Sequence, residues 1–146
     1  MIKLSSTAFK NNQTIPLKYS CTGENINPPL FINNVPLGTK SLAMIVDDPD
    51  APRGDWVHWL VWNIPAKTLE ITEHSIMVDS VQGLNDFGNN KYDGPCPPSG
   101  THRYFFKLYA LDIILNLTKN SKKGDLEKAM VGHILDQTIL TGLYSK

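Results

Sequence analysis

The sequence is poor in several features that identify whole classes of protein. Only two of its 146 residues are cysteine, and no apolar run approaches the roughly 20 residues that a membrane-spanning helix needs. Fourteen basic residues balance fourteen acidic ones, so no net charge draws the chain to nucleic acid or to an anionic membrane. We therefore expect no nucleic-acid partner and no stable membrane insertion, and any anion site must be local.

Two further absences bear on the compartment and the domain organisation. The first residues, Met1 to Ser6, lack the apolar stretch of a secretory signal peptide, which predicts a cytoplasmic location. Two cysteines in such a protein are more often free thiols than a disulfide, so we expect Cys21 and Cys96 to be unpaired, with pairing left open. A chain of this length buries enough core to fold without a covalent staple, which predicts a single domain over residues 1–146.

Arginine is also scarce, because lysine supplies almost all of the positive charge. The only two arginines, Arg53 and Arg103, both lie in loops rich in proline or acidic residues. A guanidinium is planar and can bind a carboxylate or phosphate through two parallel hydrogen bonds. Arg53 and Arg103 are therefore candidates for binding a carboxylate or phosphate in this two-bonded way.

Proline and glycine are concentrated just before a strongly apolar stretch. Residues 94–100 contain three prolines and two glycines, which exclude a helix or a central strand and predict a shaped loop. The apolar run 105–111 that follows predicts a buried strand. His102 and Tyr104 precede it on one face, as either a hydrogen-bonded core pair or part of a site.

A second polar cluster follows another apolar strand, predicted over residues 41–46. Asp47, Asp48 and Asp50 surround a proline turn, where they repel one another unless protons or donors intervene. The next predicted strand, 56–63, contains all three tryptophans and His58. Simple alternation places His58 on one face with Trp56, Leu60 and Trp62, an apolar setting in which the imidazole needs a polar partner.

The remaining elements complete a mainly β chain. We predict a short edge strand around Ile15–Tyr19, a strand at Leu30–Ile32, and a strand over 137–143 that closes a sheet edge. One late helix is predicted, with Asp125 as its N-cap and Leu126, Met130 and Ile134 on its apolar face. The loop at 83–90 is long enough to carry part of a site.

Three separated motifs occur in an order that resembles the phosphatidylethanolamine-binding protein family, also called the Raf kinase inhibitor protein family. They are Asp48-Pro49-Asp50-Ala51-Pro52, Trp56-Val57-His58-Trp59, and Gly94-Pro95-Cys96-Pro97-Pro98 leading to His102-Arg103-Tyr104. The resemblance covers almost the whole chain and is to the short bacterial and archaeal branch. It implies a Greek-key β-sandwich with a few short helices, in agreement with the strands predicted above.

The resemblance also implies a small anion pocket at one end of the sheet. It would be lined by Asp48, His58, His102 and Tyr104, with Asp50, Pro52, Trp56, Gly94 and Pro95 in or just behind its wall. Family members hold phosphate, phosphorylated headgroups, acetate or similar anions there. Alternation turns Arg103 away from the pocket and predicts that it pairs with a motif carboxylate such as Asp50, while the role of Arg53 stays open.

The residues favour an anion-binding module without cofactor or metal. The imidazoles and the tyrosine can donate to an anion, and Asp48 can orient one histidine by accepting from its ring N–H. A metal site of two histidines and an aspartate is a less favoured alternative, as is a hydrolase using His102 or His58 with Asp48. A homodimer and a regulated partner, such as a kinase or protease, are left open.

Overall fold

Two antiparallel pairs of long strands form the centre of the molecule in the computed structural model, which describes all 146 residues. The strand β4 (Ser41–Asp48) pairs with β5 (Trp56–Pro65), and β8 (Thr101–Leu111) pairs with β9 (Ile134–Ser145). Because β4 also pairs with β8, the four strands share one sheet. Two short strands, β2 (Gln13–Thr14) and β7 (Val81–Gln82), extend it to the order β2-β9-β8-β4-β5-β7.

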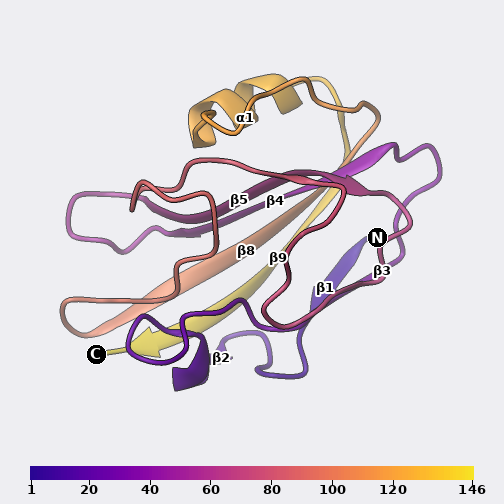
Figure 1. Ribbon diagram of the computed structural model, residues 1–146. Coiled ribbons are helices and arrows are strands. Elements are labelled where there is room, and N and C mark those ends of the chain that lie inside the picture. Colours follow the sequence, from indigo (N-terminus) through magenta and orange to yellow (C-terminus); the bar gives the residue numbers. More distant parts are fainter.

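A smaller sheet lies against one face of this large sheet (Figure 1). It consists of β1 (Lys3–Ser5), β3 (Leu30–Asn33) and β6 (Glu70–Ile71), in the order β1-β3-β6. The main hydrophobic core fills the space between the sheets, with Leu4 and Ile32 on one side and Met44 and Phe106 on the other. Burial of these apolar side chains is the main stabilising contribution to the sandwich.

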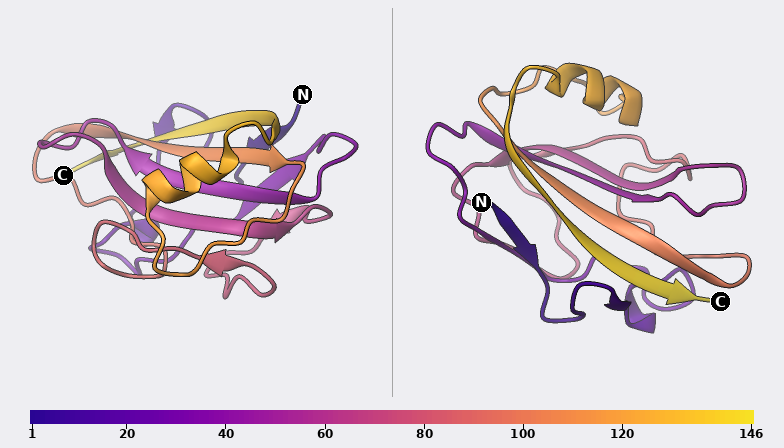
Figure 2. Two further views of the ribbon diagram at one scale, coloured as in Figure 1. Left: turned by 90° about the horizontal axis from the view of Figure 1, so that it is seen from above. Right: turned by 180° about the vertical axis from the view of Figure 1, so that it is seen from behind.

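The opposite face of the large sheet is covered by α1 (Lys123–Met130), which lies across the long strands in the left panel of Figure 2. A second hydrophobic cluster forms there, in which Leu126 and Met130 of the helix meet Ile45 and Leu60 of the sheet. Since β4 lies in the middle of the sheet, it is buried along its whole length. This confirms the prediction of a strand buried on both faces.

The predicted fold class is confirmed: the protein is mainly β, with two sheets, one α-helix and a 3-10 turn, η1 (Leu17–Tyr19). The Greek-key strand order stays a prediction. The edge strand predicted around Ile15–Tyr19 is wrong, because the chain pairs earlier, at β2, and then turns into η1. Proline at position 16 fixes φ at −59°, which starts the turn and removes a donor from any ladder.

Two details of the predicted helix also differ. Asp125 is the third helical residue rather than the N-cap, and its carboxylate accepts from the backbone N–H of Lys122, the true N-cap. Ile134 lies in β9 rather than on the helix, because the chain leaves the helix at Val131 and turns through Gly132, whose φ is +82°.

The prediction of two free thiols is wrong, because Cys21 and Cys96 form a disulfide. Their Cα atoms lie 5.4 Å apart although 75 residues separate them in the sequence, and this spacing is in the range that a disulfide requires. Neither the composition nor the N-terminal sequence reports that proximity. The cytoplasmic location stays a prediction. None of the helical segments has the length and apolar character needed to cross a bilayer.

Candidate functional site

The three predicted motifs meet at one end of the large sheet. There β4 ends, while β5 and β8 begin, because both run antiparallel to β4. The connecting loops gather at the end that also holds the C-terminus, on the left in Figure 1. They enclose a pocket of about 320 Å³, at the lower end of the size range of small-molecule sites.

His58 reaches the pocket through an irregularity in β5. The pairing steps from Val46↔Trp59 to Asp47↔Val57, so His58 is the extra residue of a β-bulge. The bulge puts it on the same face as Tyr104, with the two ring centroids 5.2 Å apart. Leu60 and Trp62, which simple alternation placed beside His58, instead pack on the helix side, so that part of the prediction is wrong.

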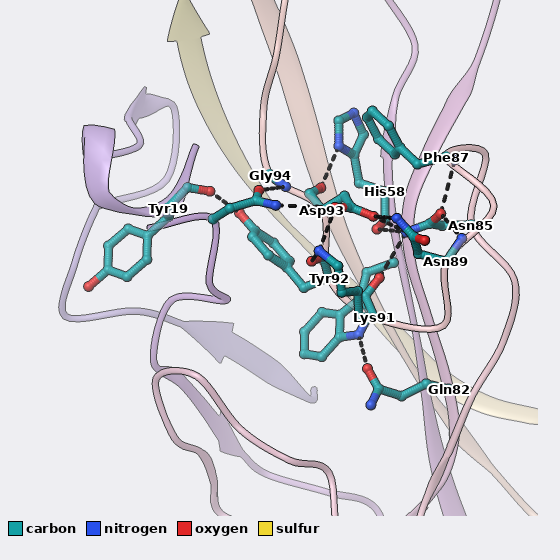
Figure 3. A network of polar contacts seen from close by, with 12 residues as sticks. Tyr19, His58, Gln82, Asn85, Phe87, Asn89, Lys91, Tyr92, Asp93 and Gly94 are labelled. Atoms are coloured by element: carbon teal, nitrogen blue, oxygen red, sulfur yellow. Dashed lines mark hydrogen bonds and ion pairs between the residues drawn. The ribbon is translucent and has the colours of Figure 1, made fainter. Parts of the chain in front are cut away.

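The polar partner expected for His58 is the backbone carbonyl of Asp93, which lies 2.6 Å from the Nδ1 atom of the ring. A carbonyl can only accept, so Nδ1 carries the proton and donates it. Figure 3 shows this bond and the second ring nitrogen, Nε2, on the far side of the ring. The imidazole is 3% exposed, and this burial lowers its pKa from the ordinary value, which favours the neutral ring.

The Asp93 side chain anchors the loop that supplies this carbonyl. Its carboxylate accepts hydrogen bonds from four side chains: Asn25, Asn85, Asn89 and Lys91. The last three are labelled in Figure 3. Burial acts to raise the pKa of this carboxyl, but the donors together hold it below its ordinary value. The Asp93 N–H also donates to the His58 carbonyl. The imidazole is therefore held at a defined position.

Asp48 was predicted to orient one of the two histidines, and the structure shows that this histidine is His102. Its Nδ1 atom lies 2.6 Å from Oδ2 of Asp48, and both side chains are buried. The other carboxylate oxygen, Oδ1, accepts from the backbone N–H of Asp50. Both oxygens of Asp48 are thus engaged by donors, and the remaining nitrogen of His102 is Nε2.

Tyr104 packs near both imidazoles with its hydroxyl unsatisfied. The residue is 1% exposed, and its phenolic oxygen has no partner within hydrogen-bonding distance, although the Asp48 carboxylate and the Cys96 backbone are its polar neighbours. Burial raises the pKa of the phenol, with a further contribution from the negative charge of Asp48. The hydroxyl therefore keeps its proton, and a buried donor without a partner is uncommon unless a ligand or water completes it.

The loop after β4 forms one wall of the pocket and is fixed by ion pairs. The Arg103 guanidinium binds Asp50 through two hydrogen bonds of 2.9 Å, which confirms the predicted pairing. These bonds lower the pKa of the Asp50 carboxyl to about 2. At the other end of the loop, Lys123 of α1 pairs with Asp55. Arg53 lies on the pocket wall and takes part in none of the ion pairs.

The opposite wall is the proline-rich loop, which is fastened to residues 19–25. The disulfide joins Cys96 to Cys21, and the N–H of Cys21 donates to the Pro95 carbonyl. The N–H of Gly94 donates to the Asn25 side chain. A side chain at position 94 would overlap the Tyr19 carbonyl, so this close packing requires glycine.

Most of the predicted site residues line the pocket. Asp48, Pro52, Trp56, His58, His102 and Tyr104 do so, whereas Asp50, Gly94 and Pro95 lie behind its walls and support it. Six further residues line the pocket without having been predicted as site residues: Ala51, Arg53, Phe87, Cys96, Pro97 and Pro98. Five of these lie inside the motifs or beside them. Phe87 belongs to the 83–90 loop, for which only the loop length indicated a site.

The pocket combines a polar base with an apolar rim. At the rim, Trp56 and Phe87 form an edge-to-face pair with ring centroids 5.5 Å apart, and prolines cover the other side. No three histidine, cysteine, aspartate or glutamate side chains are arranged to hold a metal ion. The absence of a bound metal stays a prediction.

Proteins similar to this chain share both its sequence and its structure. It is 48% identical over 150 residues to a UPF0098 protein of Methanothermobacter thermautotrophicus, with 99% of each chain covered. A crystal structure described as a phosphatidylethanolamine-binding protein homologue from Chlamydia trachomatis matches 99% of this chain and 97% of its own, with 43% identity and a TM-score of 0.96.

A second solved structure is more distant in sequence but similar in fold. YbcL of E. coli, described as a member of the mammalian PEBP family, is 31% identical, has a TM-score of 0.93, and is matched over 98% of its chain and 99% of this one. The phosphatidylethanolamine-binding protein family model matches residues 5–145. The resemblance found in the motifs is thereby confirmed, and the chain belongs to the phosphatidylethanolamine-binding protein family.

Proposed function

We propose that the protein is a binding module for small anions such as phosphate, acetate or a phosphorylated compound. The observation that carries the proposal is the buried Tyr104 hydroxyl, which has no partner and belongs to a ring that packs near both imidazoles. A ligand oxygen that accepted from this hydroxyl would satisfy it. Hydrogen bonds to an ionised ligand are stronger than those between neutral groups.

The rigidity of the walls supports the same proposal. The proline-rich loop is tied by a disulfide, and the opposite loop is held by the Arg103–Asp50 pair. A pocket that is already ordered loses little conformational entropy when a ligand enters. Regulation of a partner protein through the pocket surface stays a prediction.

A hydrolase remains the alternative, because an imidazole held by a carboxylate is also a general base. The pocket contains no serine or threonine, and Cys96 is in a disulfide rather than a thiolate. A hydrolytic reaction would therefore have to use an activated water. We favour binding without turnover, because no group on the pocket wall is an evident nucleophile.

Calorimetric titration with phosphate and with acetate tests the proposal. His102→Ala removes a charge-assisted hydrogen bond and is expected to weaken binding roughly ten- to a hundredfold. Tyr104→Phe removes one neutral donor and is expected to cost about tenfold or less. His74→Asn is the control, since His74 is exposed outside the pocket and its φ of 53° suits asparagine.

The proposal is wrong if wild type binds neither phosphate nor acetate, or if both His102→Ala and Tyr104→Phe bind them as tightly as wild type does. Incubation with phosphoesters and acyl esters tests the alternative. Turnover by wild type that is lost in His102→Ala would establish the hydrolase.

A further inference from the structure

The two imidazoles present an unexpected hydrogen-bonding pattern to the pocket. His58 donates a hydrogen bond from Nδ1 to the Asp93 backbone carbonyl, and His102 donates one from Nδ1 to the Asp48 carboxylate. Both partners are acceptors, so each Nδ1 carries a proton, and in a neutral ring each Nε2 then bears only a lone pair. With neutral rings, the base of the pocket holds two acceptors and one donor, the Tyr104 hydroxyl.

This pattern does not suit an anion unless a proton is added. An oxyanion offers only lone pairs, so it would face the lone pair of a neutral His58. Burial disfavours the charged ring of His58, whereas an anion beside Nε2 favours it. The two effects act in opposite directions, and the occupant of the pocket decides between them.

We propose that the pocket takes its oxyanion together with one proton, which binds to Nε2 of His58. This inference rests on the proposed anion-binding function and adds the chemical form in which the ligand enters. The imidazolium then donates to the anion from Nε2 while Nδ1 keeps its bond to the Asp93 carbonyl. Affinity therefore falls as the pH rises above the range in which the bound form of His58 keeps its proton.

The groups that surround His58 identify it as the site of proton uptake. Asp93 and Tyr104 contact the ring, and the other titratable or charged groups that line the pocket with it are Asp48 from β4, Arg53 from the following loop and His102 from β8. The charge of Asp48 favours a proton on His58, and Tyr104 stays protonated because burial raises its pKa. The His102 ring contacts a carboxylate even before a ligand enters, whereas the His58 ring contacts only the neutral backbone carbonyl of Asp93, so only a ligand can place a full negative charge in direct contact with it. His58 is therefore the ring whose charge depends most on the ligand.

Calorimetry of acetate binding at pH 7.5, in two buffers with different heats of ionisation, measures the protons taken up. Acetate is fully ionised at this pH, so any uptake belongs to the protein. We expect close to one proton for wild type and for the His74→Asn control, and an affinity that falls by up to tenfold per pH unit between pH 7 and 8.5. His58→Gln can donate through its amide, so it is expected to bind with uptake near zero.

The outcomes separate this inference from the function on which it rests. Binding without proton uptake, or uptake that persists unchanged in His58→Gln, overturns the inference and leaves the anion site standing. Absence of acetate and phosphate binding overturns both. If His58→Gln fails to fold, the ring nitrogen chemical shifts of wild-type His58 decide, because they must move to imidazolium values when acetate is added.

Discussion

Asp47 and Asp48 are neighbours on one strand, but they face opposite sides of the large sheet. Asp47 points to the helix side, where it is fully buried and accepts from Lys107 and Lys123 at 2.9 Å each. Asp48 points to the pocket side and contacts the His102 ring at 2.6 Å. Identical carboxylates thus receive different partners because successive residues of a strand alternate between its faces.

The partners determine what each carboxylate can do. Both cations beside Asp47 are lysines. Burial opposes the charge on Lys123, yet its bonds to Asp55 and Asp47 raise its pKa, so this lysine stays charged at ordinary pH values. The partner of Asp48 is an imidazole, whose ordinary pKa lies near neutrality. The helix side therefore serves stability, while the pocket side can respond to protons and ligands.

The largest effect is expected from the disulfide on the pocket side. Replacing both cysteines, Cys21→Ser with Cys96→Ser, opens a loop of 75 residues and should lower the free energy of unfolding by about 4–5 kcal/mol. Denaturant unfolding without reductant measures it. Wild type treated with a dithiol should approach the variant, and a change below about 1 kcal/mol would mean that the backbone bonds between the loops already order them.

Removing the buried carboxylate on the helix side should come next. Asp47→Ala leaves Lys107 and Lys123 without their common partner and is expected to cost about 3–5 kcal/mol of stability. Asp112→Ala is the control, since Asp112 forms an exposed pair with His133 and should cost at most about 1 kcal/mol. Equal losses in the two variants would contradict the structural role assigned to the helix side.

The sharpest test of the comparison is the matched pair Asp47→Asn and Asp48→Asn. Asp48→Asn should weaken phosphate binding about tenfold, roughly 1.4 kcal/mol, because His102 loses the carboxylate that orients its ring toward the ligand. Asp47→Asn should leave the affinity unchanged. Tighter binding by Asp48→Asn in calorimetry would favour simple charge repulsion and contradict this reading of the site.

The smallest effect concerns acid stability. Burial lowers the pKa of His58 in the folded protein below its unfolded value of about 6.5, so the unfolded chain binds the extra proton first as the pH falls. The stability is complete above that pH and declines below it, by at most about 1.4 kcal/mol per pH unit. Thermal unfolding in buffers without phosphate or carboxylates should show a flatter decline for His58→Gln than for wild type. Parallel curves would contradict a neutral buried ring.

Local chemistry made much of the fold and site predictable. A continuous apolar run specified β4, and proline and glycine specified the loop at 94–100. Alternation from His102 to Tyr104 correctly turned Arg103 away from the pocket and toward Asp50. The family motifs located most of the pocket wall. Each of these inferences depends on residues that lie close together in the sequence, either through their backbone and side-chain preferences or through a short motif that they form.

Other features depended on contacts that no local pattern contains. The bulge at His58 arises from how β5 pairs with β4, and it places this ring on the opposite face from Leu60 and Trp62, with which alternation grouped it. The position of Phe87 depends on how a long loop folds back over the same strand.

By itself, then, the sequence determined the strands, the rigid loops and the residue types at one end of a sheet, because these follow from side-chain periodicity and backbone restriction over a few residues. The tertiary structure alone decided that Cys21 meets Cys96, that His58 donates to the Asp93 carbonyl, and that the Tyr104 hydroxyl is buried without a partner. The reason is that each of these facts is a contact or a missing contact between distant segments, and its geometry exists only when the whole sheet has formed.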